Sequence, residues 1–331
     1  MKKYNRLFGY ICLVFCFILV LFSLKNLNKN NNASNGRLIS NYQEKDQQIR
    51  IGCKINKEKY ERDCLNLLND LRNPNPNMFF NPPLDQIPNS MFNDFTQFGE
   101  MPLSKLWYFN EPYYDWSSNY SVKKEIITKS EVSYFRTNDG KKRPENNYGD
   151  WYNHYYLRKY SKNIRNKTFL VFGSIKPWLE AIALDNQASK VFTFDYNRKT
   201  YEENNLMQWW HINDYLDYSL KTKKLENFDN SASYSFIEHL GLGRYGDPLD
   251  PNGDIKAVNL IHCLLKENGF LFLGLPSSVD NSSYVYFNAY RVYGNKRIDK
   301  LLGDNWEIVE QTNRTQSHSM FILKKKYSYT C

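Results

Sequence analysis

The pattern of hydrophobic and polar residues predicts a membrane segment, then a polar stretch, then a folded body. The run Phe8–Leu24 is continuously apolar and uncharged, and it approaches the roughly 17–25 residues that cross the hydrocarbon core of a bilayer as a helix. Residues 25–50 are rich in Asn, Lys and Gln, so they predict a flexible stem. Residues 51–160 are interpreted as an accessory helical and aromatic region, and residues 161–331 as the main domain.

The flanks of the apolar run predict its orientation. No small-x-small cleavage motif follows it, which favours an uncleaved signal anchor over a cleaved signal peptide. Positive residues lie on both sides, with a slight bias toward residues 1–7, which are therefore predicted to be a cytoplasmic tail. We expect a single-pass type II membrane protein of the endoplasmic reticulum or Golgi with a lumenal body. All potential N-glycosylation sites follow the apolar run, which is consistent with a lumenal body: Asn32, Asn119, Asn166, Asn281 and Asn313.

After residue 166 short apolar runs alternate with helical spacing. Thr168–Phe172 predicts a strand, Trp178–Asp185 a helix, and Lys190–Asp195 a second strand that ends in an acid. Strands that alternate with helices predict an α/β fold, with a mostly parallel sheet covered by helices on both faces.

The same patterns predict elements on either side of this unit. A helix is expected over Asn56–Arg72, after which a proline-rich stretch stops regular structure. Later in the chain we expect strands at Ser231–Phe236 and Gly269–Pro276, a helix at Asp254–Lys266, and an antiparallel edge pair at Trp306–Thr312 and Ser319–Lys326.

Composition and charge narrow the function classes. Of 331 residues, 41% are hydrophobic and 16% aromatic, which is ample for a core and excludes global disorder. The net charge of +9 is scattered and accompanies no nucleic-acid-binding motif. We therefore expect attraction to acidic membranes or glycans and no nucleic-acid partner.

The cysteines are compatible with disulfides and not with a metal site. Cys53, Cys64, Cys263 and Cys331 lie outside the apolar run, an even number that allows two lumenal disulfides whose pairing the spacing leaves open. Cys263, within an apolar run, can equally be a buried small hydrophobic residue. No Cys-x-x-Cys or His-x-x-x-His pair occurs, so no structural metal site is expected.

The loop after the first predicted strand is a candidate cofactor site. In open α/β sheets ligands bind beyond the carboxyl ends of the strands. Gly173 and Ser174 begin this loop, and Asp195, followed by Tyr196, ends the next strand 22 residues after Gly173, close to the roughly 20 residues typical of an acid that binds a ribose. A full Gly-x-Gly-x-x-Gly is absent, which argues against a dinucleotide and less against S-adenosylmethionine. An ordinary turn and a solvent-facing Asp195 remain the alternative.

Three stretches resemble a known family: Ser235–Asp254, Leu264–Pro276 and Phe287–Gly294. They are similar to a nematode-rich family known as domain of unknown function 268, which itself resembles class I S-adenosylmethionine-dependent methyltransferases. The segments FLVFGS and TFDYN look like the first cofactor motif and the acid-ending second strand of those enzymes. The resemblance covers residues 166–326 and implies a Rossmann-like domain, S-adenosylmethionine as cofactor, and an unknown acceptor, which is a small molecule, glycan or protein.

The loop Ser235–Asp254 would overhang the reaction centre and supplies the candidate catalytic residues. His239 is the candidate base because of its ordinary pKa, with Glu238 as its orienting partner or as an alternative base. Arg244 can hold an anionic substrate group, and Asp247 completes the set. Asp and Gly are also common turn residues, so the loop can equally be structural.

Two other function classes stay open. The missing glycines fit a non-catalytic binding module. The anchor and stem fit a Golgi glycosyltransferase, although no Asp-x-Asp metal motif occurs in the body.

Overall fold

The computed structural model describes residues 54–104, 125–137, 150–202, 205–312, 318–327 and 329–330. The described residues fall into two units, a larger one within residues 57–327 and a smaller one of residues 54–56 and 329–330. In the smaller unit, β1 (Lys54–Ile55) pairs antiparallel with β14 (Tyr329–Thr330). The predicted anchor and stem lie outside the described residues and stay predictions. Within the described ranges, no helix has the length and apolar character needed to cross a bilayer.

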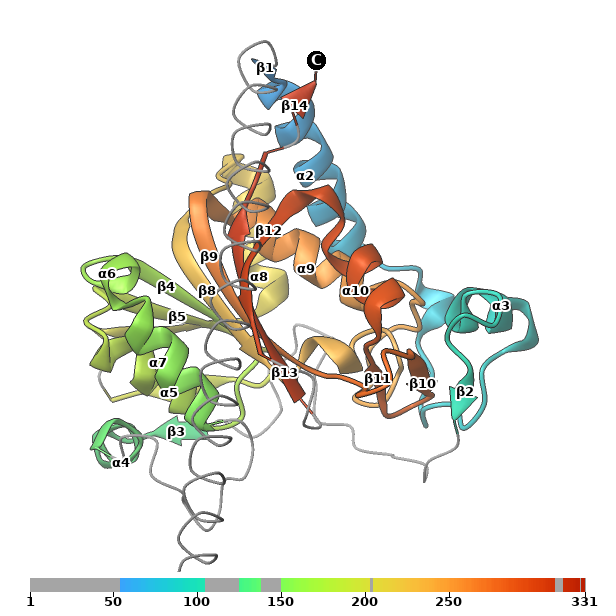
Figure 1. The fold of residues 1–331 in the computed structure, drawn as a ribbon, viewed down its shortest axis with the longest axis horizontal. Coiled ribbons are helices and arrows are strands. Elements are labelled where there is room, and N and C mark those ends of the chain that lie inside the picture. Colours follow the sequence, from blue (N-terminus) through green and yellow to red (C-terminus); the bar gives the residue numbers. More distant parts are fainter. Residues whose placement is uncertain are drawn as a thin grey trace, which may run out of the picture. The chain divides into compact units, whose positions relative to one another are not determined.

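The larger unit is built on a seven-stranded sheet in the order β12-β13-β9-β8-β4-β5-β7 (Figure 1). Five neighbouring strands are parallel, whereas β13 runs antiparallel to both its neighbours. The prediction of a mostly parallel sheet with an antiparallel edge is therefore confirmed. The strands are β4 (Thr168–Phe172), β5 (Lys190–Phe194), β7 (Met207–Trp210), β8 (Phe228–Tyr234), β9 (Leu265–Pro276), β12 (Trp306–Gln311) and β13 (His318–Lys325).

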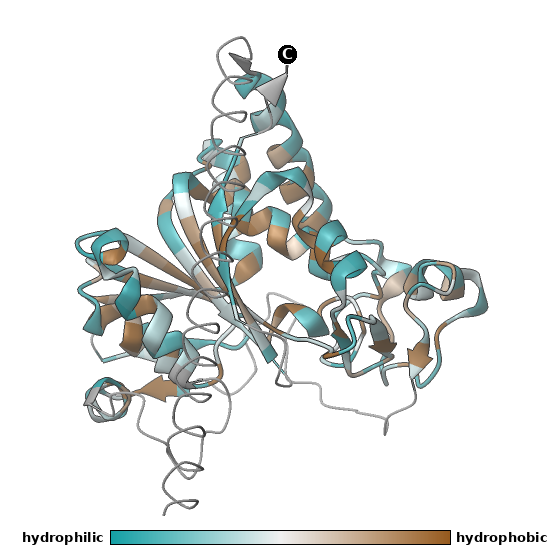
Figure 2. Cartoon of the chain, viewed as in Figure 1, coloured by the Kyte–Doolittle hydropathy of each residue, from teal (hydrophilic) through white to brown (hydrophobic). Residues whose placement is uncertain are grey.

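Helices cover both faces of this sheet, as predicted. Successive strand residues point to opposite faces, so Leu170 and Phe172 of β4 enter one core and Phe169 and Val171 the other. Hydrophobic residues dominate β4 (TFLVF) and the second half of β9, whereas β8 (FDNSASY) carries several polar residues (Figure 2). The first face carries α2 (Lys57–Arg72), α8 (Ile212–Thr222), α9 (Gly253–Leu264) and α10 (Asn295–Leu302). The second carries α4 (Lys129–Thr137), α5 (Asp150–Lys159), α6 (Ser161–Ile164) and α7 (Trp178–Asp185).

Smaller elements flank the sheet. A three-stranded sheet with its own apolar core combines β2 (Leu103–Ser104), β10 (Tyr284–Tyr286) and β11 (Tyr290–Val292) with α3 (Phe92–Thr96). A parallel pair joins β3 (Glu125–Ile127) to β6 (Lys199–Tyr201). Single 3₁₀ turns are η1 (Pro76–Met78), η2 (Asn89–Met91), η3 (Ile237–His239) and η4 (Gly303–Asn305).

One cysteine pairing that the sequence left open is settled in the described part of the chain. Cys64 of α2 and Cys263 of α9 form a disulfide, and both are buried. Cys263 is therefore both a disulfide partner and a member of the core on the α2 face. Cys53 and Cys331 lie outside the described residues.

Candidate functional site

A cavity of about 350 Å³ opens at the carboxyl ends of β4 and β5. It lies beside the point where the strand order reverses between β4 and β8, which is where open α/β sheets bind ligands. Large apolar side chains contribute much of the lining: Phe172, Tyr196, Ile212, Leu216, Leu249 and Leu260. Polar residues share the lining, and they are Asp70, Asn73, Asn75, Asp247, Asp250 and Lys256. The cavity thus suits a ligand with an apolar ring system and polar groups.

Of the predicted cofactor-binding residues, Tyr196 lines this cavity and Gly173, Ser174 and Asp195 do not. Asp195 is buried, and its burial raises the pKa of its carboxyl group. Its Oδ2 accepts a hydrogen bond from the Ser174 N–H (3.0 Å), and its Oδ1 accepts one from the Asn197 N–H (2.8 Å). Asp195 is therefore not the solvent-facing residue of the alternative interpretation. It links the turns that follow β4 and β5.

A glycine is needed at position 173 because it leaves space for the side chain of Phe236, and not because the loop has to stay open. Its φ is +78°, and a Cβ on Gly173 would lie 2.1 Å from Cγ of Phe236. The Phe236 ring thus covers the glycine at the place where the prediction puts the cofactor. The cofactor-binding roles of Gly173 and Asp195 stay predictions, and Tyr196 is the member of the predicted set that lines the cavity.

Glu238 and His239 lie at the end of η3. Glu238 is fully buried, and burial raises its pKa to about 7. Its Oε1 accepts a hydrogen bond from Ser235 Oγ (2.6 Å), while its Oε2 has no hydrogen-bond partner among the described residues. Burial lowers the pKa of His239 to about 4. Its Nδ1 lies 2.6 Å from the carbonyl oxygen of Ala289; a carbonyl can only accept, so Nδ1 carries the hydrogen and Nε2 the lone pair.

Two residues that the sequence did not indicate complete this group. His318, at the start of β13, places Nε2 3.4 Å from Ser235 Oγ, and its ring stacks on Tyr234. Burial lowers the pKa of His318 to about 4. Ser235 adopts a left-handed φ of 50° directly after β8, which is unusual for a residue with a side chain. We call Ser235, Glu238, His239 and His318 the Ser235 cluster.

Asp247 and Arg244 are placed differently from the other predicted catalytic residues. Asp247 is buried, which raises its pKa, and its Oδ2 accepts a hydrogen bond from the Gly241 N–H (2.6 Å) while Oδ1 accepts one from the Tyr245 N–H (3.3 Å). It therefore braces the loop and lines the cavity. The guanidinium of Arg244 lies 4.8 Å from the centre of the Tyr245 ring, and that ring meets the His239 ring edge-on.

A comparison with protein families tests the resemblance inferred from the sequence. Residues 166–329 match the family described as "Caenorhabditis protein of unknown function, DUF268". This segment belongs to that family. The resemblance inferred from the sequence is thus confirmed, and its start at residue 166 agrees with the prediction. No curated protein matches the chain.

Solved structures similar to the chain include methyltransferases. One is 1,6-didemethyltoxoflavin-N1-methyltransferase from Burkholderia thailandensis, which is 14% identical, with 60% of this chain and 87% of that chain covered and a TM-score of 0.41. Another is the N-methyltransferase NodS from Bradyrhizobium japonicum, also 14% identical, with 59% and 98% covered and a TM-score of 0.38. The DUF268 segment contains all seven strands of the central α/β sheet.

Within the DUF268 segment, a buried charge network holds the loop that carries Glu238 and His239. Arg291 donates through Nη1 to the carbonyl of Leu240 (2.6 Å) and through Nη2 to that of Asp250 (3.2 Å). Asp254 neutralises this region by pairing with Arg297 and by lying 3.8 Å from Arg291 Nε. Arg291 therefore holds the loop through its backbone carbonyls, and its side chain is buried away from solvent.

Tyr293 belongs to the same network. Its hydroxyl donates to Asp254 Oδ2 (3.0 Å), and its ring is fully buried. Arg291 and Tyr293 therefore both stabilise the packing of this region.

Proposed function

We propose that this chain is an S-adenosylmethionine-dependent methyltransferase whose cofactor binds in the cavity beside Tyr196. The observation that carries this is the position of the cavity, at the carboxyl ends of β4 and β5 and at the reversal of strand order. Its volume of about 350 Å³ lies within the range of small-molecule sites, roughly 300–1,000 Å³.

The charges around the cavity favour a cationic ligand. Three carboxylate residues line it, Asp70, Asp247 and Asp250, against one ammonium, Lys256. Lys256 already pairs with Asp250 at 2.7 Å. A sulfonium is compatible with this excess of carboxylates, whereas the phosphates of a dinucleotide or sugar nucleotide are repelled by it. This charge balance ranks S-adenosylmethionine above the substrate of a glycosyltransferase.

The Ser235 cluster supplies the chemistry that the protein itself must provide. A sulfonium methyl group is already electrophilic, so the chain's residues need to orient the acceptor and receive its proton. His239 is neutral at physiological pH because its pKa is lowered to about 4, and its Nε2 lone pair can accept a proton. The acceptor is a hydroxyl or amine on a small molecule, glycan or protein.

Cavity-filling variants test this function. Leu67 and Leu71 lie one turn apart on α2 and both pack against the same core, but only Leu71 lines the cavity. We expect Leu71→Trp to weaken binding of S-adenosylhomocysteine at least tenfold, or about 1.4 kcal/mol, and Leu67→Trp to leave it unchanged, as measured by calorimetric titration of the full chain. Equal affinity in the two variants, or no binding by folded wild type, would contradict the proposed site.

A non-catalytic binding module is the second candidate. The Phe236 ring over Gly173 and the engagement of both Asp195 oxygens favour it. Binding of S-adenosylhomocysteine that survives His239→Asn, with no methyl transfer by wild type to any acceptor class, would favour this module over the enzyme.

We also propose the predicted location, an anchored protein with a lumenal body in the endoplasmic reticulum or Golgi. The buried Cys64–Cys263 disulfide supports an oxidising compartment, and Asn166 and Asn281 are exposed. Digestion with an N-glycosidase is expected to increase the gel mobility of the chain made in a eukaryotic cell. Unchanged mobility would count against a lumenal body.

A further inference from the structure

One wall of the cavity comes from outside the DUF268 segment. The family match begins at residue 166, but the lining includes Asp70 and Leu71 of α2 together with Asn73, Pro74, Asn75 and Met78 after it. We call residues 70–78 the α2 wall. It supplies a carboxylate and two amides, whereas Asp247, Asp250 and Lys256 are the charged residues of the remaining lining. The family segment alone therefore lacks part of the site.

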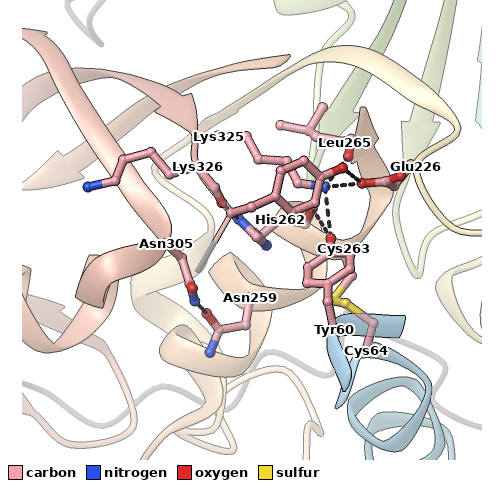
Figure 3. The surroundings of a disulfide bond; sticks show 11 residues. Tyr60, Cys64, Glu226, Asn259, His262, Cys263, Leu265, Asn305, Lys325 and Lys326 are labelled. Atoms are coloured by element: carbon pink, nitrogen blue, oxygen red, sulfur yellow. Dashed lines mark hydrogen bonds and ion pairs between the residues drawn. A yellow bond between two sulfur atoms is a disulfide. The ribbon is translucent and has the colours of Figure 1, made fainter. Parts of the chain in front are cut away.

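The disulfide joins this wall to the opposite one. Cys64 lies less than two helical turns before Asp70 on α2, and Cys263 lies one turn after Leu260 on α9. The α9 residues Gly253, Lys256, Ala257 and Leu260 line the other side of the cavity. The Cys64–Cys263 bond, drawn in Figure 3, thus connects two helices that both line the cavity.

Non-covalent contacts hold the first turns of α2 as well. The Tyr60 hydroxyl donates to the carbonyl of His262 (3.2 Å) and accepts from Lys325 Nζ (2.8 Å), which also pairs with Glu226 (Figure 3). These groups lie one turn before Cys64 and away from the wall.

Leu71 of the wall packs against the core, and the polar contacts of the wall include one ion pair and one backbone hydrogen bond. Arg72 pairs with Asp217 at 2.7 Å, but both side chains are at least one-third exposed, and such pairs contribute little. The backbone N–H of Leu249 donates to the carbonyl of Met78 (2.9 Å). The disulfide is the strongest link close to the wall.

We propose that the α2 wall is the part of the site that sets ligand affinity, and that Cys64–Cys263 is the positioning bond that holds it. Opening the bond with a dithiol transfers two electrons to the disulfide; the protein gains two thiols and the dithiol becomes a cyclic disulfide. The wall then loses its covalent tie to α9, and its ordering must be supplied by the ligand, which weakens binding.

The double variant Cys64→Ala/Cys263→Ala tests this without leaving a free thiol at either position. We expect its affinity for S-adenosylhomocysteine to fall at least tenfold in the full chain. Dithiothreitol is expected to weaken binding by wild type to the same extent and to leave the double variant unchanged. Wild-type affinity in the double variant would overturn the assignment, as would an equal effect of dithiothreitol on both proteins.

Hydrogen–deuterium exchange gives a readout that needs no ligand. Reduction of wild type is expected to increase exchange in residues 67–78, while β8 and β9 at the centre of the sheet keep their protection. Because this arm does not use S-adenosylhomocysteine, it separates failure of the positioning bond from failure of the proposed function. Unchanged exchange in residues 67–78 after complete reduction would overturn the role of the disulfide.

Discussion

Replacing Asp254 by alanine is expected to lower the free energy of unfolding by about 3–5 kcal/mol. Burial alone would raise the pKa of Asp254, but Arg291 and Arg297 hold it below its usual value. All three side chains are at most 1% exposed. Without the carboxylate, two buried guanidinium groups lose the carboxylate that pairs with them, and the hydroxyl of Tyr293 loses its acceptor. Urea unfolding at neutral pH measures the loss.

Asp299→Ala is the matched control for this variant. Asp299 is exposed on α10, so its replacement should change stability by no more than about 0.5 kcal/mol. Because Arg291 also holds the carbonyls of Leu240 and Asp250, Asp254→Ala should increase exchange in the loop that carries His239. Similar stabilities of the two variants would show that the network is not a main support of the fold.

Replacing Glu238 by glutamine is expected to change the pH dependence of stability by about 3 kcal/mol. Burial raises the pKa of Glu238 from 4.5 to about 7 in the folded chain. Between those values the unfolded state loses its proton first, so this group removes stability as the pH rises from 4.5 to 7. Glutamine is neutral throughout and can still accept the hydrogen bond from Ser235.

The measurement compares urea unfolding of the two proteins from pH 4.5 to pH 8. The variant should gain stability relative to wild type as the pH rises, and the difference should level off above pH 7. Parallel curves would mean that Glu238 is not a buried, protonatable group, and the Ser235 cluster would lose its central carboxyl.

The sequence predicted the strands and helices whose apolar spacing is regular. Thr168–Phe172 and Trp178–Asp185 are observed within the same bounds. The first is a short apolar run typical of a buried strand, and the apolar residues of the second recur with the period of a helix. The helix α8 and the strand β7 were missed: MQWW is short, and its three residues after Met207 are only half-buried, so no clear alternation results. Strand β8 begins at Phe228, three residues before the prediction, since FDN reads as a turn.

The candidate site was predictable only where neighbours in the sequence remain neighbours in the fold. Glu238 and His239 are adjacent and stay together. His318 joins them from a distant strand, and a lone histidine before an apolar run gives no signal of that contact. The α2 wall was equally hidden, because its place depends on a disulfide whose pairing spacing cannot assign. Asp195 occupies the expected motif position, but both of its carboxylate oxygens accept hydrogen bonds from backbone N–H groups.

A crystal structure of the full chain with S-adenosylhomocysteine tests the central claim most directly. We predict the nucleoside in the cavity, against Tyr196 and Leu216 on one side and the α2 wall on the other, with the Phe236 ring still covering Gly173. A nucleoside bound over Gly173, with Phe236 displaced and the ribose on Asp195, would contradict this placement of the cofactor.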